Sequence, residues 1–139
     1  VQYVLEKYGD GRLQPQPGTN ESGMFLQWVW FAEATFSRPL GEIVNHNREF
    51  ADNPLPHILD EMKARCRLCV KALDDALGSK SWIVGETFSA ADIMLGLSLR
   101  GYLRLVDKEF TGNVAPYWRR LSERPAYKRA IAAENEASG

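Results

Sequence analysis

The stretch that decides the fold is Trp82-Ile83-Val84-Gly85-Glu86-Thr87-Phe88-Ser89-Ala90-Ala91-Asp92-Ile93. Within it, the Ser89 side chain can accept a hydrogen bond from the Asp92 backbone N–H, and the Asp92 side chain can accept one from the Ser89 N–H. This is the capping-box pattern with Asp in place of Glu, and it predicts a helix that begins directly after Ser89. We assign both residues to folding rather than to catalysis.

The residues that follow, Ile93 to Val106, are apolar on nearly every side, so we expect the central, buried helix of the domain here. Gly96 and Gly101 lower the helix propensity of this segment. The close approach of a neighbouring backbone would explain why glycine stands at both positions.

The cleanest amphipathic helix is predicted over His57 to Leu77, upstream of the capping box. Gly78 follows it as a stop signal. The apolar residues step by threes and fours along one face, which indicates a helix with one buried side. They are Ile58, Met62, Cys66, Cys69, Leu73 and Leu77.

The remaining segments also favour helices. A long aromatic segment from about Glu21 to Val44 contains Pro39, which predicts a kink or break near residues 37–38. Residues 45–56 are polar and read as a loop, while Pro116 and Pro125 suit the first turns of two short closing helices. Because no segment alternates with period two, the predicted fold class is all-α, a helical bundle.

Composition excludes several classes of protein. The 139 residues include 17 basic and 18 acidic side chains, so a net charge of -1 offers no general attraction for nucleic acid or an anionic membrane. No apolar run approaches the roughly 20 residues that a membrane span needs. Two cysteines fit a reducing compartment, and residues 1–12 do not look like a signal peptide, so a cytoplasmic location is predicted.

The first residues form an apolar helical stripe with no capping residue before it. Val1, Val4, Leu5 and Tyr8 lie on one helical face, and Gly9 stands where a left-handed residue would end the helix. We therefore predict that residues 1–9 are the end of a helix from a missing upstream domain. Residues 10–20 would be a linker stiffened by prolines, and residues 21–139 the helical domain.

Several segments in this order resemble the glutathione S-transferase family. They are residues 1–9, Gln27-Trp28-Val29-Trp30-Phe31-Ala32-Glu33-Ala34, the stretch from Trp82 to Ile93, Tyr117-Trp118 and Arg124-Pro125-Ala126-Tyr127. By this resemblance the chain is the all-helical C-terminal domain, preceded by the end of the last helix of the thioredoxin-like N-terminal domain.

The resemblance implies that glutathione is a co-substrate bound mainly by the missing N-terminal domain, which supplies the thiol-activating residue. The chain as given would then have no transferase activity of its own. In this family the helical domain forms one wall of the pocket for a hydrophobic electrophile and part of a homodimer interface.

By the same resemblance, the pocket wall comes from the first long helix. Trp30, Ala34, Ser37 and Arg38 have helical spacing, so one face could hold all four. Aromatic and apolar groups would hold the electrophile, while Ser37 or Arg38 could orient its polar end. The alternatives are that Trp30 belongs to the core and that Arg38 is a solvated charge.

Other candidate residues favour structural roles. Cys66-Arg-Leu-Cys69 lies within a helix on its apolar stripe, so we interpret both cysteines as core residues and predict no metal site. His46 and His57 are isolated and are expected on the surface. Two other functions stay open: a non-catalytic helical protein-interaction module, and a parent that performs glutathione-dependent redox or isomerase chemistry.

Overall fold

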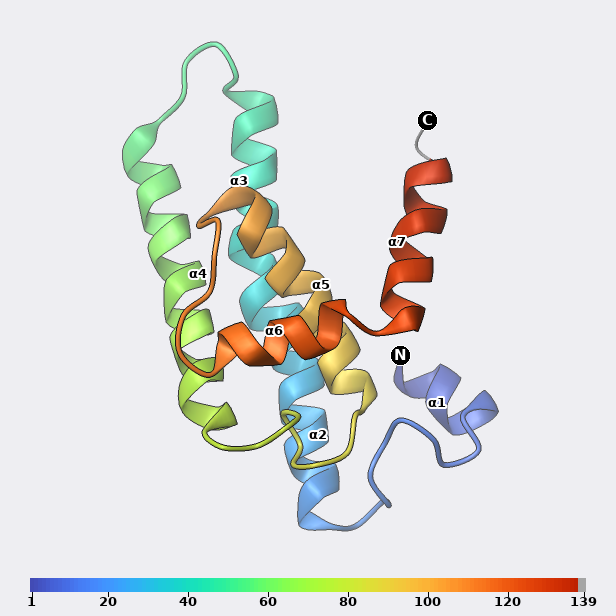
Figure 1. Ribbon diagram of the computed structural model, residues 1–139. Coiled ribbons are helices and arrows are strands. Elements are labelled where there is room, and N and C mark those ends of the chain that lie inside the picture. The colour runs from blue at the N-terminus through green and yellow to red at the C-terminus, as the bar shows by residue number, and fades with distance from the viewer. Residues whose placement is uncertain (138–139) are drawn as a thin grey trace.

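The computed structural model describes residues 1–137, and within them the chain is entirely helical apart from turns and one isolated bridge between Trp82 and Gly85 (Figure 1). The predicted all-α class is confirmed. The elements in order are α1 Gln2–Tyr8, α2 Asn20–Trp30, the π-helix η1 Phe31–Phe36, α3 Ser37–Glu49, α4 Pro56–Leu77, α5 Ala90–Leu105, α6 Val114–Ser122 and α7 Pro125–Ala137.

Helix α5 lies at the centre of the bundle. It packs against α2, η1 and α3 on one side and against α6 on another, while α4 covers α3 and α6. Leu95 and Leu99 of α5 are fully buried. Figure 1 shows α7 standing apart from the other helices, and α7 contributes no fully buried residue.

The capping box at the start of α5 ties three segments together. Asp92 is fully buried, and its Oδ2 accepts hydrogen bonds from the Ser89 N–H (2.8 Å) and the Ser89 hydroxyl (3.1 Å). Its Oδ1 accepts from the Ile83 N–H (3.0 Å) and the Tyr117 hydroxyl (2.9 Å). One carboxylate therefore fixes the loop before α5, the first turn of α5 and helix α6.

The long aromatic segment does not break at Pro39. The chain stays helical from 20 to 49, but it widens into η1 directly before α3, where the Ser37 N–H donates to the Ala32 carbonyl five residues back. Pro39 has no N–H to give to the Thr35 carbonyl, and the Cys69 thiol donates to that oxygen instead (3.9 Å). The irregularity is thus a π-helix rather than a break.

The connection between α3 and α4 is shorter than the predicted loop, because α3 continues to Glu49. His46 is buried near the end of α3 and stacks on Phe50. Its Nε2 accepts from the Leu55 N–H (3.2 Å), which closes the connection. The prediction of a surface position for His46 was therefore wrong, whereas His57 is exposed.

The segment before α2 packs against the bundle. The Leu13 carbonyl accepts from the Ala90 N–H (2.8 Å), one of the free donors at the start of α5. Asp10 and Leu13 have positive φ, whereas Gly9 has φ -78°, so the predicted left-handed end at Gly9 was wrong. Within α1, Leu5 is buried.

Side chains of α4 anchor the two ends of the α5–α6 connection. Arg67 donates two hydrogen bonds to Asp107 (2.8 and 3.0 Å), and the Tyr102 hydroxyl donates to the same carboxylate. At the other end, Asp74 accepts from the backbone N–H groups of Asn113 (2.6 Å) and Val114 (3.1 Å). Asp74 thereby caps α6 from a neighbouring helix.

None of the described helices is both long enough and apolar enough to span a membrane.

Candidate functional site

A groove of about 420 Å³ runs between α3 and α5, and we name it the α3–α5 groove. Its walls are mostly apolar, with small residues along the floor. It is lined by Ser37, Leu40, Gly41, Val44, Leu97, Ser98, Gly101, Arg104 and Leu105.

Two hydroxyl groups lie in this groove in a fixed order. Ser98 is buried, and its hydroxyl donates to the Ala32 carbonyl (3.2 Å). Since that uses its single proton, the Ser37 hydroxyl donates to Ser98 across 3.0 Å. The lone pairs of Ser37 Oγ therefore remain as an acceptor at the groove wall.

Two glycines hollow out the groove. A Cβ added to Gly41 would meet no atom within 4 Å, so this position opens onto free space. A Cβ on Gly101 would lie 3.3 Å from the Leu40 side chain, and one on Gly96 would lie 2.8 Å from Leu121. The expected close approach at these α5 glycines is therefore made by side chains and not by a neighbouring backbone.

Arg104 gives this groove its charge. Among the groove-lining residues that the structure describes, it alone is ionisable. Glu134 of α7 lies near enough that the charges of both Arg100 and Arg104 lower the pKa of its carboxyl, chiefly through the hydrogen bond from Arg100. Arg100 and Arg104 of α5 therefore both lie near the Glu134 carboxylate of α7.

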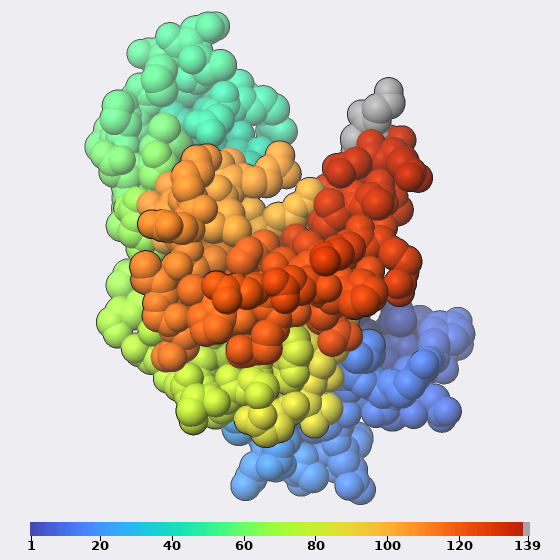
Figure 2. All heavy atoms as spheres, in the orientation of Figure 1, coloured from blue at the N-terminus to red at the C-terminus, as the bar shows by residue number. Residues whose placement is uncertain are grey.

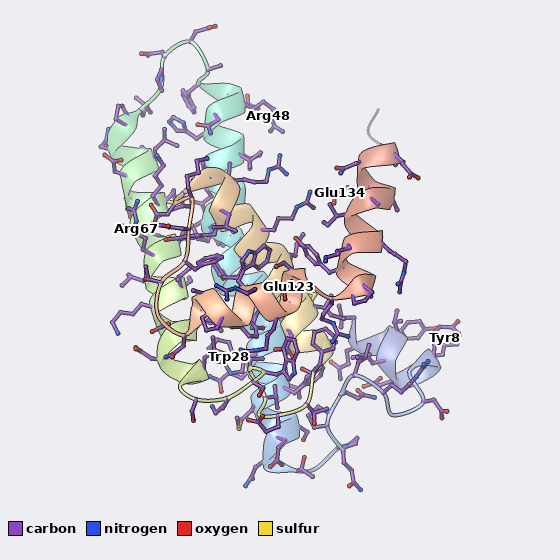
Figure 3. All side chains as sticks on the ribbon, viewed as in Figure 1. Tyr8, Trp28, Arg48, Arg67, Glu123 and Glu134 are labelled. Carbon is purple, nitrogen blue, oxygen red and sulfur yellow. The ribbon has the colours of Figure 1, made fainter. Side chains whose placement is uncertain are left out.

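A second groove of about 380 Å³ lies between α5 and α7, the α5–α7 groove, and Figure 2 shows the molecule hollowed between α7 and the end of α5. Its apolar wall includes Ile93 and Leu97, whose side chains are 48% and 64% exposed. The predicted all-round burial of α5 was therefore wrong. Glu134 points from α7 toward the bundle, where it pairs with Arg100 (Figure 3).

A third groove, the α3–α4 groove, has a volume of about 330 Å³ and lies on the other side of α3. It contains the exposed side chain of Leu68, which is 67% accessible. Salt bridges Arg38–Glu42 and Arg65–Glu61 lie beside it. Its lining residues are Ala34, Thr35, Arg38, Pro39, Glu42, Arg65, Leu68 and Cys69.

The structure separates the four residues predicted to share one face. Ser37 lines the α3–α5 groove, whereas Ala34 and Arg38 line the α3–α4 groove. Trp30 is 62% exposed at the end of α2. Ser37 and Arg38 are consecutive residues of α3 and therefore lie about 100° apart around it. The wider turns of η1 also change the angular spacing between the residues before it and those of α3.

Sequence reasoning did not find Gly41, Gly101 or Arg104 as site residues. Gly101 was assigned to helix packing, and an arginine on an apolar helix is ordinarily a solvated charge. Their spacing does contain a signal, since Gly101 and Arg104 lie three residues apart on one helical face. That signal has meaning only once α3 is known to pack beside this face.

The environment of Cys66 and Cys69 favours a structural role for both residues. Both are buried, and burial raises the pKa of the Cys66 thiol to about 11 and also raises that of Cys69. Both thiols are therefore protonated and weakly nucleophilic at neutral pH. Across residues 1–137, no group of three His, Cys, Asp or Glu side chains is placed to hold a metal ion.

Neither models of protein families nor curated protein sequences match the chain. Solved structures do. The glutathione transferase URE2P8 from Phanerochaete chrysosporium, crystallised with oxidized glutathione, superposes with a TM-score of 0.85 at 22% identity over 99% of this chain. A glutathione S-transferase from Actinobacillus pleuropneumoniae gives 0.75 at 26% identity over 95%.

A third similar structure is Ure2p5 from Phanerochaete chrysosporium, cocrystallised with 1-(S-glutathionyl)-2,4-dinitrobenzene. It gives a TM-score of 0.85 at 18% identity over 99% of this chain. The chain spans 64%, 60% and 66% of the length of these three proteins, in the order given. This chain therefore has the fold of the helical C-terminal domain of the glutathione S-transferases.

Proposed function

We propose that this chain forms the co-substrate wall of a glutathione transferase-like protein and works together with a thioredoxin-like domain that binds glutathione. The observation that supports this most directly is the open side of α5. The central helix of a bundle is ordinarily covered all round, yet Ile93 and Leu97 are exposed between two apolar grooves. An apolar face of this kind marks an interaction surface.

The similar structures support glutathione as the co-substrate. One of them holds oxidized glutathione, and another holds a conjugate of glutathione with a dinitrophenyl group. In such a conjugation the glutathione thiolate forms a bond to the electrophilic carbon, and the leaving group departs with its electron pair. This chain would supply the apolar surface for the electrophile, with Ser37 at the wall.

We further propose that the α3–α4 groove forms part of a homodimer interface. The exposed Leu68 and the small Ala34 give it an apolar centre. The two salt bridges beside it place both signs of charge at its rim, so two copies could meet there with opposite charges facing.

The test begins with the reading frame that encodes the chain, extended upstream of the Val1 codon. We expect a thioredoxin-like segment there. The protein from the extended frame should conjugate glutathione to 1-chloro-2,4-dinitrobenzene with release of chloride, whereas the 139-residue chain alone should not. Both proteins contain residues 1–139, so a difference in activity between them is due to the upstream segment.

Two outcomes would contradict the proposal. A frame that encodes no thioredoxin-like segment would favour the helical interaction module. A full-length protein that leaves the dinitrophenyl substrate unchanged but reduces a glutathione mixed disulfide would favour redox chemistry. The absorbance of the dinitrophenyl thioether and the release of free glutathione separate the two reactions.

A further inference from the structure

We infer that the corner formed by α6 and the start of α7 is a docking surface for an acidic peptide segment of a partner protein. Lys108 and Arg119 bind its carboxylates, and a groove beside them holds one of its apolar side chains. This groove shares no lining residue with the three grooves described above. The inference therefore goes beyond the proposed function and does not depend on it.

Positive charge is concentrated in one part of the chain. Residues 108–129 contain six basic and two acidic side chains, a net charge of +4. The remaining residues contain 11 basic and 16 acidic side chains, a net charge of -5. Figure 2 shows α6 and the start of α7 on one face of the molecule. We name the six cations of this segment the basic corner: Lys108, Arg119, Arg120, Arg124, Lys128 and Arg129.

The basic corner is not neutralised from within the chain. Across residues 1–137, none of its six side chains forms a salt bridge. Arg124 lies 3.5 Å from the centre of the Phe88 ring. Arg120 donates to the Ser81 carbonyl (2.9 and 3.2 Å), and its charge, after the hydrogen bonds from Ser81, lowers the pKa of the Glu86 carboxyl. The other four cations are exposed and have no such contact: Lys108, Arg119, Lys128 and Arg129.

A groove of about 320 Å³ lies within the basic corner, and we name it the α5–α6 groove. Lys108 lines it from the α5–α6 connection and Arg119 lines it from α6, while Phe110 and Trp118 add aromatic walls. The Trp118 ring packs edge-on against Phe110 (6.0 Å between centroids) and Tyr127 (5.8 Å), which fixes its position. The groove thus offers a preformed apolar hollow beside two cations.

The contacts available in this groove fit carboxylates and apolar side chains in alternation. A carboxylate beside Lys108 and Arg119 accepts charge-assisted hydrogen bonds, and the Arg119 guanidinium can donate two of them in parallel. An apolar side chain next to that carboxylate is removed from water against Trp118. The aromatic wall and the cations therefore act on neighbouring residues of one bound segment.

The charge distribution favours a short acidic segment over a nucleic acid or a membrane. A long polyanion or an extended anionic surface reaches past the basic corner, where the remaining residues carry -5 and repel it over a distance of about 8 Å at physiological ionic strength. Glu109 lines the α5–α6 groove and Glu123 separates α6 from α7, so the corner is not the continuous basic track of a single-strand binder. A short segment meets the cations alone.

The probe for the experiment is a short acetylated peptide in which glutamates alternate with leucines. A second peptide replaces every glutamate with glutamine, and a third replaces every leucine with glycine. Each is titrated into the 139-residue chain, with affinity measured by isothermal titration calorimetry and position read from NMR shifts. The chain has four tryptophans, so the indole N–H signal of Trp118 is assigned by its loss in Trp118→Phe.

We expect the glutamate–leucine peptide to shift the Trp118 indole signal and the amide signals of Lys108 and Arg119. Replacing its glutamates should weaken binding about tenfold, and replacing its leucines about threefold. Arg119→Gln and Lys108→Gln should each weaken it about threefold to fivefold, because each removes one exposed charge pair. The matched control Arg12→Gln removes an exposed charge from the segment after α1 and should leave the affinity unchanged.

The inference is overturned if the glutamine peptide binds as tightly as the glutamate peptide, or if Arg12→Gln weakens binding as much as Arg119→Gln does. An unmoved Trp118 signal at the highest peptide concentration would overturn it as well. Single-stranded oligouridylate and vesicles of phosphatidylserine and phosphatidylcholine are titrated in the same buffer. Tighter binding of either at the Trp118 signal would assign the basic corner to a nucleic acid or a membrane instead.

Circular dichroism of each variant checks the fold, which should persist because Lys108, Arg119 and Arg12 are exposed. None of these measurements needs glutathione or an upstream domain. A failure here therefore leaves the proposed function standing, and the absence of a thioredoxin-like segment would leave this docking surface standing.

Discussion

At the scale of single residues, the Asp92 carboxylate accepts four hydrogen bonds within the bundle. The donors are the backbone N–H groups of Ile83 and Ser89 and the hydroxyl groups of Ser89 and Tyr117, and the Asp92 side chain is fully buried. Burial and the nearby Asp92 charge raise the pKa of Tyr117, which keeps that hydroxyl protonated as a donor. A carboxylate at this position is matched to its surroundings because it offers only acceptors.

We therefore expect Asp92→Asn to lower the free energy of unfolding by about 3 kcal/mol, because an amide places an N–H group against N–H donors. Urea denaturation followed by circular dichroism measures the change. Tyr117→Phe is the matched control, since it removes one of the four hydrogen bonds and should cost about 1 kcal/mol. Equal losses in the two variants would contradict the account of Asp92.

A second residue-scale prediction concerns the turn before α6. Gly112 has φ +59°, and a Cβ there would lie 2.5 Å from Asp74 Oδ1, the atom that caps α6. Gly112→Ala should therefore lower the free energy of unfolding by about 2 kcal/mol or more, through backbone strain and loss of the cap. Gly18→Ala, at φ +82° with open space around it, is the control and should cost about 1 kcal/mol. Thermal unfolding of both variants tests the difference. Equal decreases in the melting temperature of the two variants would contradict the proposed clash with Asp74.

At the scale of the elements, the junction between α4 and the end of α5 depends on pH. Hydrogen bonds from Arg67 and Tyr102 lower the pKa of the Asp107 carboxyl to about 2, below its ordinary value of 3.8. The folded state thus favours the charged carboxylate, so its contribution to stability is present above about pH 4 and is lost as the pH falls toward 2. Because the Asp107 side chain is 38% exposed, solvent screening keeps this contribution at about 1 kcal/mol or less.

Asp107→Asn tests this junction. The variant should lose less stability than the unchanged chain when the pH is lowered from 5 to 2, because its amide does not titrate. Urea unfolding at several pH values measures the two slopes. Asp75→Asn is the control, because it removes an exposed carboxylate that pairs with Lys71 within α4. This control should keep the slope of the unchanged chain. If the Asp107 variant keeps the original slope, the junction does not titrate as described.

The elements themselves were largely predictable from local pattern. The amphipathic stripe of α4 ends at Gly78, which has φ +48°, and Pro116 and Pro125 stand in first helical turns as predicted. Pro56, which was predicted to lie in the loop, begins α4. The π-helix was not predictable, because the constraint of Pro39 is accommodated several residues upstream. The burial of His46 was missed for a similar reason, since its partner Leu55 lies across a turn.

At the scale of the whole molecule, the grooves could be predicted only in part. The family resemblance placed Ser37 in the wall of the electrophile pocket; the structure places Ser37 at the α3–α5 groove, and its role in binding stays a prediction. The sequence could not supply Arg104, because which residue of α5 faces α3 depends on how the two helices pack. It also placed Ala34 and Arg38 on the face of Ser37, but Ser37 and Arg38 are adjacent in α3 and lie about 100° apart, and η1 changes the angle between Ala34 and Ser37.

The proposed dimer gives a prediction at this scale. Leu68→Asp places a charge at the apolar centre of the α3–α4 groove, so we expect the variant to sediment as a monomer while the unchanged chain sediments as a dimer. The fold should persist, because Leu68 is exposed in the single chain. Val44→Asp, at an exposed position on the other side of α3, should leave the dimer intact. A monomeric unchanged chain at all concentrations would contradict the proposal.

The π-helix η1 also sets how this domain tolerates changes in length. A π-turn is equivalent to one extra residue within an α-helix, so deleting a single residue between Phe31 and Phe36 would restore regular turns. Because the wider turn already absorbs the extra residue, the residues beyond the deletion would face nearly as they do now relative to α2. Ser37 would stay beside Ser98, and the α3–α5 groove would keep its hydroxyl acceptor. A single-residue deletion within η1 should therefore be tolerated better than one within α3, where no wide turn can absorb the change in length and the residues beyond it would rotate by about 100°.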